Sequence, residues 1–171
     1  AASDVYKRQA MIASGMMESS SVDALIGGFE RGMLQVPGVA FLSVGAGVDT
    51  VQPLIDTFDS VYLSHDNCPH QCVVVGEEKA LNGLQESLKG AGILSQILPF
   101  QSGFHSPLYR PYLEEHRTRF QSLQWQTPRY PVWSGTHVRP FPDEEETVQE
   151  WALEHLEAPV RFREMVEGLY G

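Results

Sequence analysis

Between residues 39 and 100 the chain alternates short apolar segments with two amphipathic stretches, a pattern that few folds accommodate. Glycines, prolines and polar clusters separate the segments, and β-branched residues fill the short ones, as is typical of strands. The longer stretches have apolar residues at helical spacing. The predicted elements are strands at 39–44, 61–64, 72–75 and 93–100 and helices at 49–58 and 77–90. This order of strand, helix, two strands, helix and strand is the split-βαβ or ferredoxin-like arrangement, in a self-contained lobe.

On either side of this lobe the sequence is mainly helical. The predicted elements are two helices within 10–36, a helix at 107–123, a short strand at 131–134, a helix after the acidic run 143–146, and a last helix at 161–169. Residues 10–38 and 101–171 have few predicted strands of their own, which is little structure from which to build an independent hydrophobic core. We therefore expect them to be parts of one larger α/β subdomain, cut from something bigger, with residues 39–100 inserted in it.

The first nine residues differ in character from the rest of the chain. They lack the apolar core of a signal peptide, and Lys7 and Arg8 stand just before an apolar stretch that opens at Ala10 without a helix cap. We expect residues 1–9 to be a foreign or misassembled leader.

The charge balance excludes several classes of partner. Twelve basic and 22 acidic residues give a net charge of −10, which argues against nucleic acid or an anionic membrane as the main partner. The sequence contains no apolar run of transmembrane length. With only two cysteines, a disulfide scaffold is not expected, and the compartment is predicted to be reducing and cytoplasmic.

A zinc site is a hypothesis for His65, Cys68, His70 and Cys72, which supply nitrogen and sulfur ligands within eight residues. No second ligand pair comes after them, however, and structural zinc sites usually need two pairs. We expect these residues to be part of a turn and a strand, with no metal bound.

His105 is the one candidate general base. It lies in Q-S-G-F-H-S-P, between a predicted strand and a predicted helix, where loops often carry catalytic residues. A purely structural histidine is the alternative, and Ser106 is expected to cap the next helix. No G-x-S-x-G nucleophile elbow occurs. Ser134, in W-S-G-T-H, lacks the preceding glycine and is expected to be a strand end.

Several longer stretches point to a family. They are A-M-I-A-S-G-M at 10–16, F-E-R-G at 29–32, S-H-D-N-C-P-H-Q-C-V-V-V-G at 64–76, G-F-H-S-P-L-Y at 103–109 and H-L-E-A-P-V-R-F at 155–162. In this order and spacing they resemble the malonyl-CoA:acyl-carrier-protein acyltransferase family. The resemblance is greatest to the acyltransferase domains of type I polyketide and polyunsaturated fatty acid synthases. It covers residues 10–171.

The resemblance implies a fold and a reaction. The fold is an α/β-hydrolase-like subdomain with an inserted ferredoxin-like lobe. The reaction transfers malonyl from malonyl-CoA to a serine and then to the phosphopantetheine thiol of an acyl carrier protein. The implied partners are the carrier protein and neighbouring synthase domains, and no cofactor is bound.

The resemblance also implies roles for single residues. His105 would be the general base and acid, and Arg31 would bind the malonyl carboxylate. The backbone carbonyl of His155 would accept a hydrogen bond from His105 and fix its tautomer. Asn67, grouped with Arg31 and Phe104 as a substrate-binding residue, would order the turn beside the site, or form a structural Asx turn. Phe104 would favour malonyl over methylmalonyl, because its ring leaves less room for an α-methyl group.

Three positions depart from the family pattern. The register places the nucleophilic serine at position 4, where Asp4 stands, so we expect this chain to be inactive alone. Gly103 replaces the usual alanine, which could loosen the loop, and His155 replaces an asparagine or glutamine.

Two other functions remain open. One is a non-catalytic acyltransferase-like module that docks a carrier protein or a synthase domain, with a local basic surface supplied by Arg110, Arg117 and Arg119. The other is an ordinary α/β serine hydrolase, against which Arg31 speaks, since a neutral ester offers nothing for a buried arginine to bind.

Overall fold

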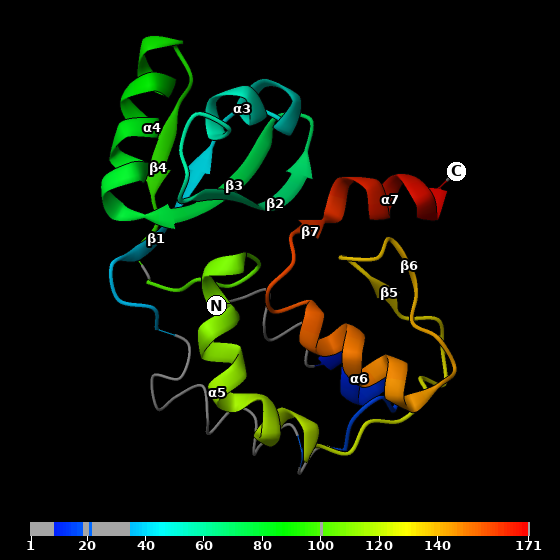
Figure 1. Cartoon of the computed structure of the whole chain (residues 1–171). Coiled ribbons are helices and arrows are strands. Elements are labelled where there is room, and N and C mark those ends of the chain that lie inside the picture. The colour runs from blue at the N-terminus through cyan, green and yellow to red at the C-terminus, as the bar shows by residue number, and fades with distance from the viewer. Residues whose placement is uncertain (1–8, 19–20, 22–34, 100, 171) are drawn as a thin grey trace.

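The computed structural model describes residues 9–18, 21, 35–99 and 101–170. Figure 1 shows two parts: a sheet with two helices on one face, and a group of helices with a small hairpin. The two helices predicted within 10–36 lie largely outside the described residues. In the described stretch 9–18, residues 9–13 are helical.

The predicted order of four strands and two helices is present between residues 39 and 97. The elements are β1 (Val39–Val44), α3 (Val48–Ile55), β2 (Val61–Cys68), β3 (Gln71–Glu77), α4 (Glu78–Gly90) and β4 (Ser95–Ile97). The strands are ordered β4-β1-β3-β2, and each pair of neighbours is antiparallel. A fifth strand, β7 (Val160–Arg161), pairs parallel with β2, so that His65 lies opposite Val160. The sequence pattern predicts no strand at these two residues.

Both faces of the central strands are buried, which explains why β3 reads as a continuous apolar run. Alternate residues of β1 and β3, such as Leu42 and Val74, pack with helices α3 and α4 in one core. The intervening residues, such as Phe41 and Val75, pack in a second core with Tyr109 of the helical part. The second core therefore joins the sheet to the helices below it.

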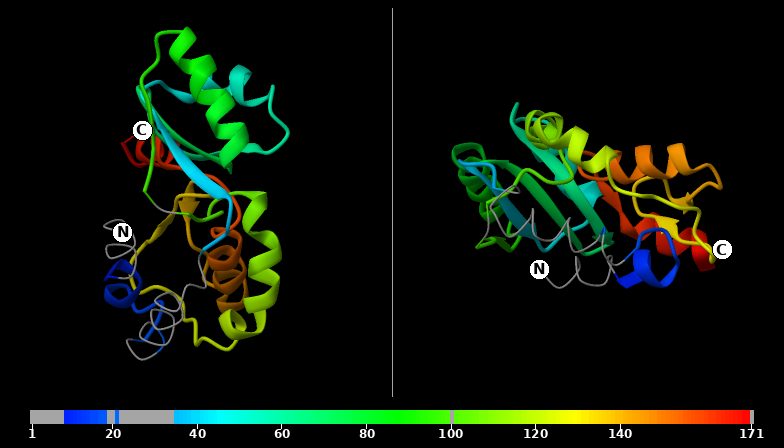
Figure 2. Two further views of the ribbon diagram at one scale, coloured as in Figure 1. Left: turned by 90° about the vertical axis from the view of Figure 1, so that its left-hand side faces the viewer. Right: turned by 90° about the horizontal axis from the view of Figure 1, so that it is seen from below.

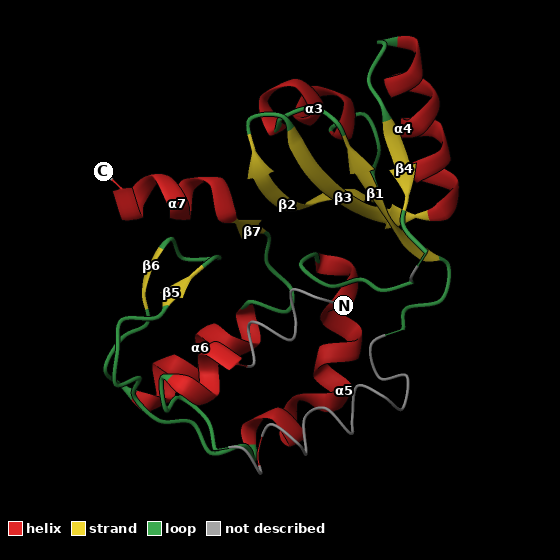
Figure 3. Ribbon diagram, turned by 180° about the vertical axis from the view of Figure 1, so that it is seen from behind, coloured by secondary structure: helices red, strands yellow, loops and turns green. Residues whose placement is uncertain are grey.

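The helical part lies below the sheet (Figure 3) and contributes Tyr109, Leu113 and Leu153 to the second core. Its elements are η1 (Pro107–Tyr109), α5 (Arg110–Gln121), β5 (Trp133–Ser134), β6 (Arg139–Pro140), α6 (Glu145–Glu154) and α7 (Phe162–Tyr170). The helix predicted at 107–123 is thus a 3₁₀ turn followed by an α-helix, with Pro107 in its first turn. Ser134 ends β5, as the sequence predicts. Among the described residues, no helix is long and apolar enough to cross a membrane.

Strand β2 is longer than predicted. The stretch D-N-C-P-H-Q was expected to be a turn, but Asp66, Asn67 and Cys68 belong to β2, and only Pro69 and His70 lie between the strands. Pairing with β3 on one side and β7 on the other supplies hydrogen bonds that outweigh the low strand preference of Asp and Asn. Two register shifts, at Leu63/His65 and Asp66/Cys68, mark bulges.

The four residues of the zinc hypothesis point in different directions. Cys72 belongs to the core under α3 and α4, whereas His70 is exposed at the turn. In the part of the chain that the structure describes, no group of three or more His, Cys, Asp or Glu residues is arranged to hold a metal ion.

The two thiols are expected to differ sharply in reactivity. Burial, and secondarily the Asp66 carboxylate, raises the pKa of Cys72 to about 12, whereas Cys68 is only half-buried. Because the thiolate is the reactive form, Ellman's reagent at pH 8 should modify one thiol of the native chain, and two after denaturation. Equal rates for both thiols in the native chain would contradict the burial of Cys72.

Candidate active site

His105 lies in the loop between β4 and η1, with its backbone held in an unusual conformation. Its φ is 59°, in the left-handed region that histidine tolerates better than most residues. The backbone N–H donates to the Leu156 carbonyl at 2.8 Å, just beyond the end of α6. The residue is 7% exposed. The loop is therefore fastened to α6 at the residue expected to be the general base.

The His105 imidazole is fastened to the same place. Its Nδ1 lies 2.6 Å from the carbonyl oxygen of His155, so the contact expected from the sequence is present. A carbonyl oxygen only accepts hydrogen bonds, so Nδ1 must carry the proton and donate it. In the neutral ring the lone pair then lies on Nε2. This is the arrangement that a general base requires, with one nitrogen held and the other serving as the basic atom.

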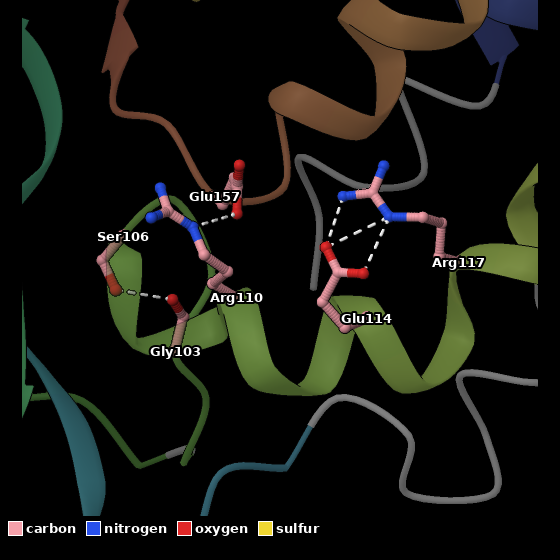
Figure 4. A network of polar contacts seen from close by, with 6 residues as sticks. All are labelled: Gly103, Ser106, Arg110, Glu114, Arg117 and Glu157. Carbon is pink, nitrogen blue, oxygen red and sulfur yellow. Dashed lines mark hydrogen bonds and ion pairs between the residues drawn. The ribbon is translucent and has the colours of Figure 1, made fainter.

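The loop on either side of His105 is tightly closed. The Ser106 hydroxyl donates to the Gly103 carbonyl at 2.7 Å (Figure 4). Ser106 occupies the predicted cap position of η1, but its side chain makes no capping hydrogen bond to the next turn. A methyl group on Gly103 would lie 3.2 Å from the Leu108 carbonyl carbon and the Tyr109 nitrogen. Glycine thus permits this close approach.

Two further imidazoles pack against His105. The His65 ring is 4.8 Å away, centroid to centroid, and the His155 ring 4.7 Å, and both contacts are edge-to-face. Ser64 Oγ lies 2.9 Å from His65 Nδ1 and also donates to the Phe104 carbonyl at 3.3 Å. Sequence reasoning assigned no catalytic role to His65. The sequence signal for His65 was weak, since it consists only of a place two residues before Asn67, within the stretch 64–76 that carries part of the family resemblance.

A cavity of about 450 Å³ lies beside these histidines. Its polar lining includes His65, Asn67, Ser134 and His155, and the remainder is mostly apolar. Asn67 donates from Nδ2 to Gln71 Oε1 at 2.5 Å, across the β2–β3 turn. That hydrogen bond spans the turn which Asn67 was expected to order. A role for Asn67 toward a substrate stays a prediction.

The other expected site residues either do not line this cavity or lie outside the described residues. Phe104 is half-buried, with its ring 4.5 Å from Tyr109 and 6.0 Å from His105. Neither Phe104 nor His105 is among the described residues that line the cavity. Arg31 and Asp4 lie outside the described residues, so their roles stay predictions.

This fold has counterparts among known proteins. The acyl transferase domain of SpnD, solved with 2-(pent-4-yn-1-yl)malonyl, superimposes with a TM-score of 0.87 at 25% identity, over 96% of this chain and 40% of that one. The malonyl CoA-acyl carrier protein transacylase of Coxiella burnetii, at 18% identity, has the same fold, with a TM-score of 0.84 over 94% of this chain and 53% of that one.

Sequence comparison agrees with the fold. The non-reducing polyketide synthase stmB of Aspergillus ustus is 28% identical over 160 residues, which are 90% of this chain and 8% of that protein. The molecule therefore has the mixed α/β fold of an acyltransferase domain. Residues 12–169 match the acyl transferase domain family, and the chain belongs to this family.

Proposed function

We propose that this chain is part of an acyltransferase that moves a malonyl group from malonyl-CoA, through an acyl-serine, to the phosphopantetheine thiol of an acyl carrier protein. The observation that carries this proposal is the double attachment of His105 to the end of α6, by its backbone N–H and by Nδ1. Family membership and the names of the polyketide synthase and transacylase relatives support the same reaction.

In the proposed reaction His105 takes part in four proton transfers, which move two protons in turn. Its Nε2 takes the proton of the serine hydroxyl as the serine oxygen attacks the thioester carbonyl, and returns it to the sulfur of coenzyme A as that thiol leaves. It then takes the proton of the pantetheine thiol as the sulfur attacks the acyl-serine, and returns it to the serine oxygen. The His155 carbonyl stabilises the charged ring in each step.

The remaining roles are proposed by resemblance to the family. Arg31 would pair with the malonyl carboxylate through two parallel hydrogen bonds. Phe104, its ring held against Tyr109, would disfavour an α-methyl group. One methyl group in a pocket changes the free energy of substrate discrimination by only ~1–3 kcal/mol.

The two thioesters make the acyl group reactive, so the reaction needs no bound cofactor or metal. Both cysteines are free thiols, which fits a cytoplasmic location.

The docking-module alternative gains little from the surface of α5. Arg110 is paired with Glu157, and Arg117 with Glu114 (Figure 4), so neither offers an uncompensated charge to an acidic carrier protein. The side chain of Arg119 lies outside the described part of the chain.

The direct test is malonyl transfer by the full polypeptide that contains this chain. With malonyl-CoA and a carrier protein bearing phosphopantetheine, mass spectrometry should show a malonyl adduct on the carrier, and in competition malonyl should exceed methylmalonyl. The 171 residues alone, with Asp4 at the expected nucleophile position, should transfer nothing. Carrier binding by the full polypeptide without any transfer would contradict the proposal and favour the docking module.

A further inference from the structure

The hairpin formed by β5 and β6 brings a threonine hydroxyl to the residue that holds His105. Thr136 Oγ1 lies 2.8 Å from Nδ1 of His155. His155 in turn contacts His105 twice, through its carbonyl oxygen at 2.6 Å and through its ring at 4.7 Å. A chain of contacts thus runs from Thr136 through one residue to the proposed general base.

The tip of this hairpin is held in one conformation. The Ser134 hydroxyl accepts hydrogen bonds from the backbone N–H groups of Thr136, at 3.3 Å, and His137, at 3.2 Å. The Val138 N–H donates to the Ser134 carbonyl at 2.8 Å. Val138 itself has a φ of 57°, which is rare and costly for a β-branched residue. Such a conformation persists only when its surroundings determine it, so Thr136 has little freedom to move.

The hairpin is also fixed relative to α6. The His137 ring stacks on Trp151 with centroids 3.7 Å apart and planes within 12°. His137 Nε2 lies 3.0 Å from a carboxylate oxygen of Glu154. The Arg139 guanidinium lies 4.7 Å from the centre of the Trp151 ring. Because these contacts attach the hairpin to the last turns of α6, the Thr136 hydroxyl is presented to His155 at a defined point.

The side chain of His155 needs a contact that fixes its orientation. Its backbone is the C-terminal cap of α6, with its N–H bonded to the Trp151 carbonyl at 3.0 Å. Rotation about the bond to the ring is broad for histidine, so the backbone alone does not determine how the imidazole faces His105. A hydrogen bond to Nδ1 selects one ring orientation.

We propose that Thr136 is a positioning residue, which holds the His155 imidazole edge-on to His105 and so keeps the His105 ring aligned with the His155 carbonyl. This rests on the proposed function for its consequence in catalysis, but the alignment itself is a property of the folded chain. A general base that loses its alignment loses rate in the chemical step and leaves substrate binding almost unchanged.

The first test separates alignment from catalysis. In the full polypeptide with ¹⁵N-labelled histidine, Thr136→Val should replace the Nδ1–H form of the His105 ring by a mixture of tautomers, whereas Thr136→Ser should retain it. Thr127→Val is the matched control, because the Thr127 hydroxyl makes a similar bond to the Asp143 carbonyl away from the site. If Thr136→Val leaves the His105 nitrogen shifts as unchanged as Thr127→Val does, the positioning role is wrong. This readout does not depend on acyl transfer.

The second test uses rates. Thr136→Val should lower kcat for malonyl transfer by about tenfold with KM within about twofold, a fraction of the roughly 10²- to 10⁴-fold that general acid–base catalysis contributes. Thr136→Ser should restore the rate. Because Thr136 acts through the imidazole, adding Thr136→Val to His155→Gln should cost nothing further. The proposal would be overturned if the losses of Thr136→Val and His155→Gln added in the double variant, or if Thr136→Val changed KM without changing kcat. This holds even if one variant folds poorly. Absence of transfer by the unmodified polypeptide would overturn the proposed function, while the spectra would still decide the alignment.

Discussion

Replacing His105 by alanine should reduce malonyl transfer by about 10²- to 10⁴-fold, the usual contribution of a general acid–base residue. In the structure this imidazole donates its Nδ1 proton to the His155 carbonyl, so Nε2 is the atom that accepts a proton. No other histidine among the described residues combines a left-handed backbone, a backbone anchor and a ring anchor at the end of α6. The measurement is the initial rate of carrier malonylation by the full polypeptide.

Folding has to be separated from chemistry in this experiment. The left-handed backbone at position 105 disfavours alanine, whereas asparagine tolerates it. His105→Asn should therefore fold like the unmodified protein and still lose activity to a similar extent. His70→Ala, at an exposed turn, is the control that should change nothing. Activity within about tenfold of the unmodified rate for His105→Asn would remove His105 from the mechanism.

Arg163→Ala is expected to produce the largest loss of stability, about 3 kcal/mol in the free energy of unfolding. Asp66 of β2 has a side chain that is only 5% exposed, and its Oδ2 accepts from Arg163 Nε at 2.9 Å. Its other oxygen, Oδ1, is buried without a hydrogen-bond partner among the described residues. Without Arg163, this carboxylate would remain buried with no cation beside it. Since α7 lies where the sheet part and the helical part meet (Figure 2), Arg163→Ala should also weaken the attachment of one part to the other.

A matched control lies on the same segment. Arg161 pairs with Glu164, but both side chains are more than 40% exposed, so Arg161→Ala should cost under about 1 kcal/mol. Urea denaturation measures both variants. Adding Asp66→Asn to Arg163→Ala should recover part of the loss, because it removes the stranded charge. Equal losses for Arg163→Ala and Arg161→Ala would show that the buried pair does not stabilise the fold.

The local patterns predicted the elements of the sheet part well, and the reason is physical. Strands β1 and β3 are buried on both faces, so their apolar runs are continuous, and α4 presents Leu81, Leu84 and Leu88 at helical spacing to one core. The prediction was wrong where pairing between distant segments decides the outcome. Asp66 and Asn67 have low strand preference, yet they lie in β2, whose Asp66 pairs with both β3 and β7.

The site was predictable only in part, for the same reason. His105 was identified as a candidate from its place between a strand and a helix, and the His155 carbonyl through the family resemblance; the structure brings them together. Nothing in the spacing of the sequence shows that His65 and Thr136 belong with them. His65 comes from a bulged strand and Thr136 from the tip of a strained hairpin, and both positions depend on contacts with the segment 155–161.

The protonation of the His105 ring tests the proposed chemistry most directly, and it can be read from the ¹⁵N shifts of the two ring nitrogens in the unmodified protein. When the ring is neutral, we expect the proton on Nδ1, donated to the His155 carbonyl, and an unprotonated Nε2. A proton on Nε2 instead would mean that the carbonyl does not hold the ring. His105 would then lack the basic nitrogen that the proposed acyl transfer requires.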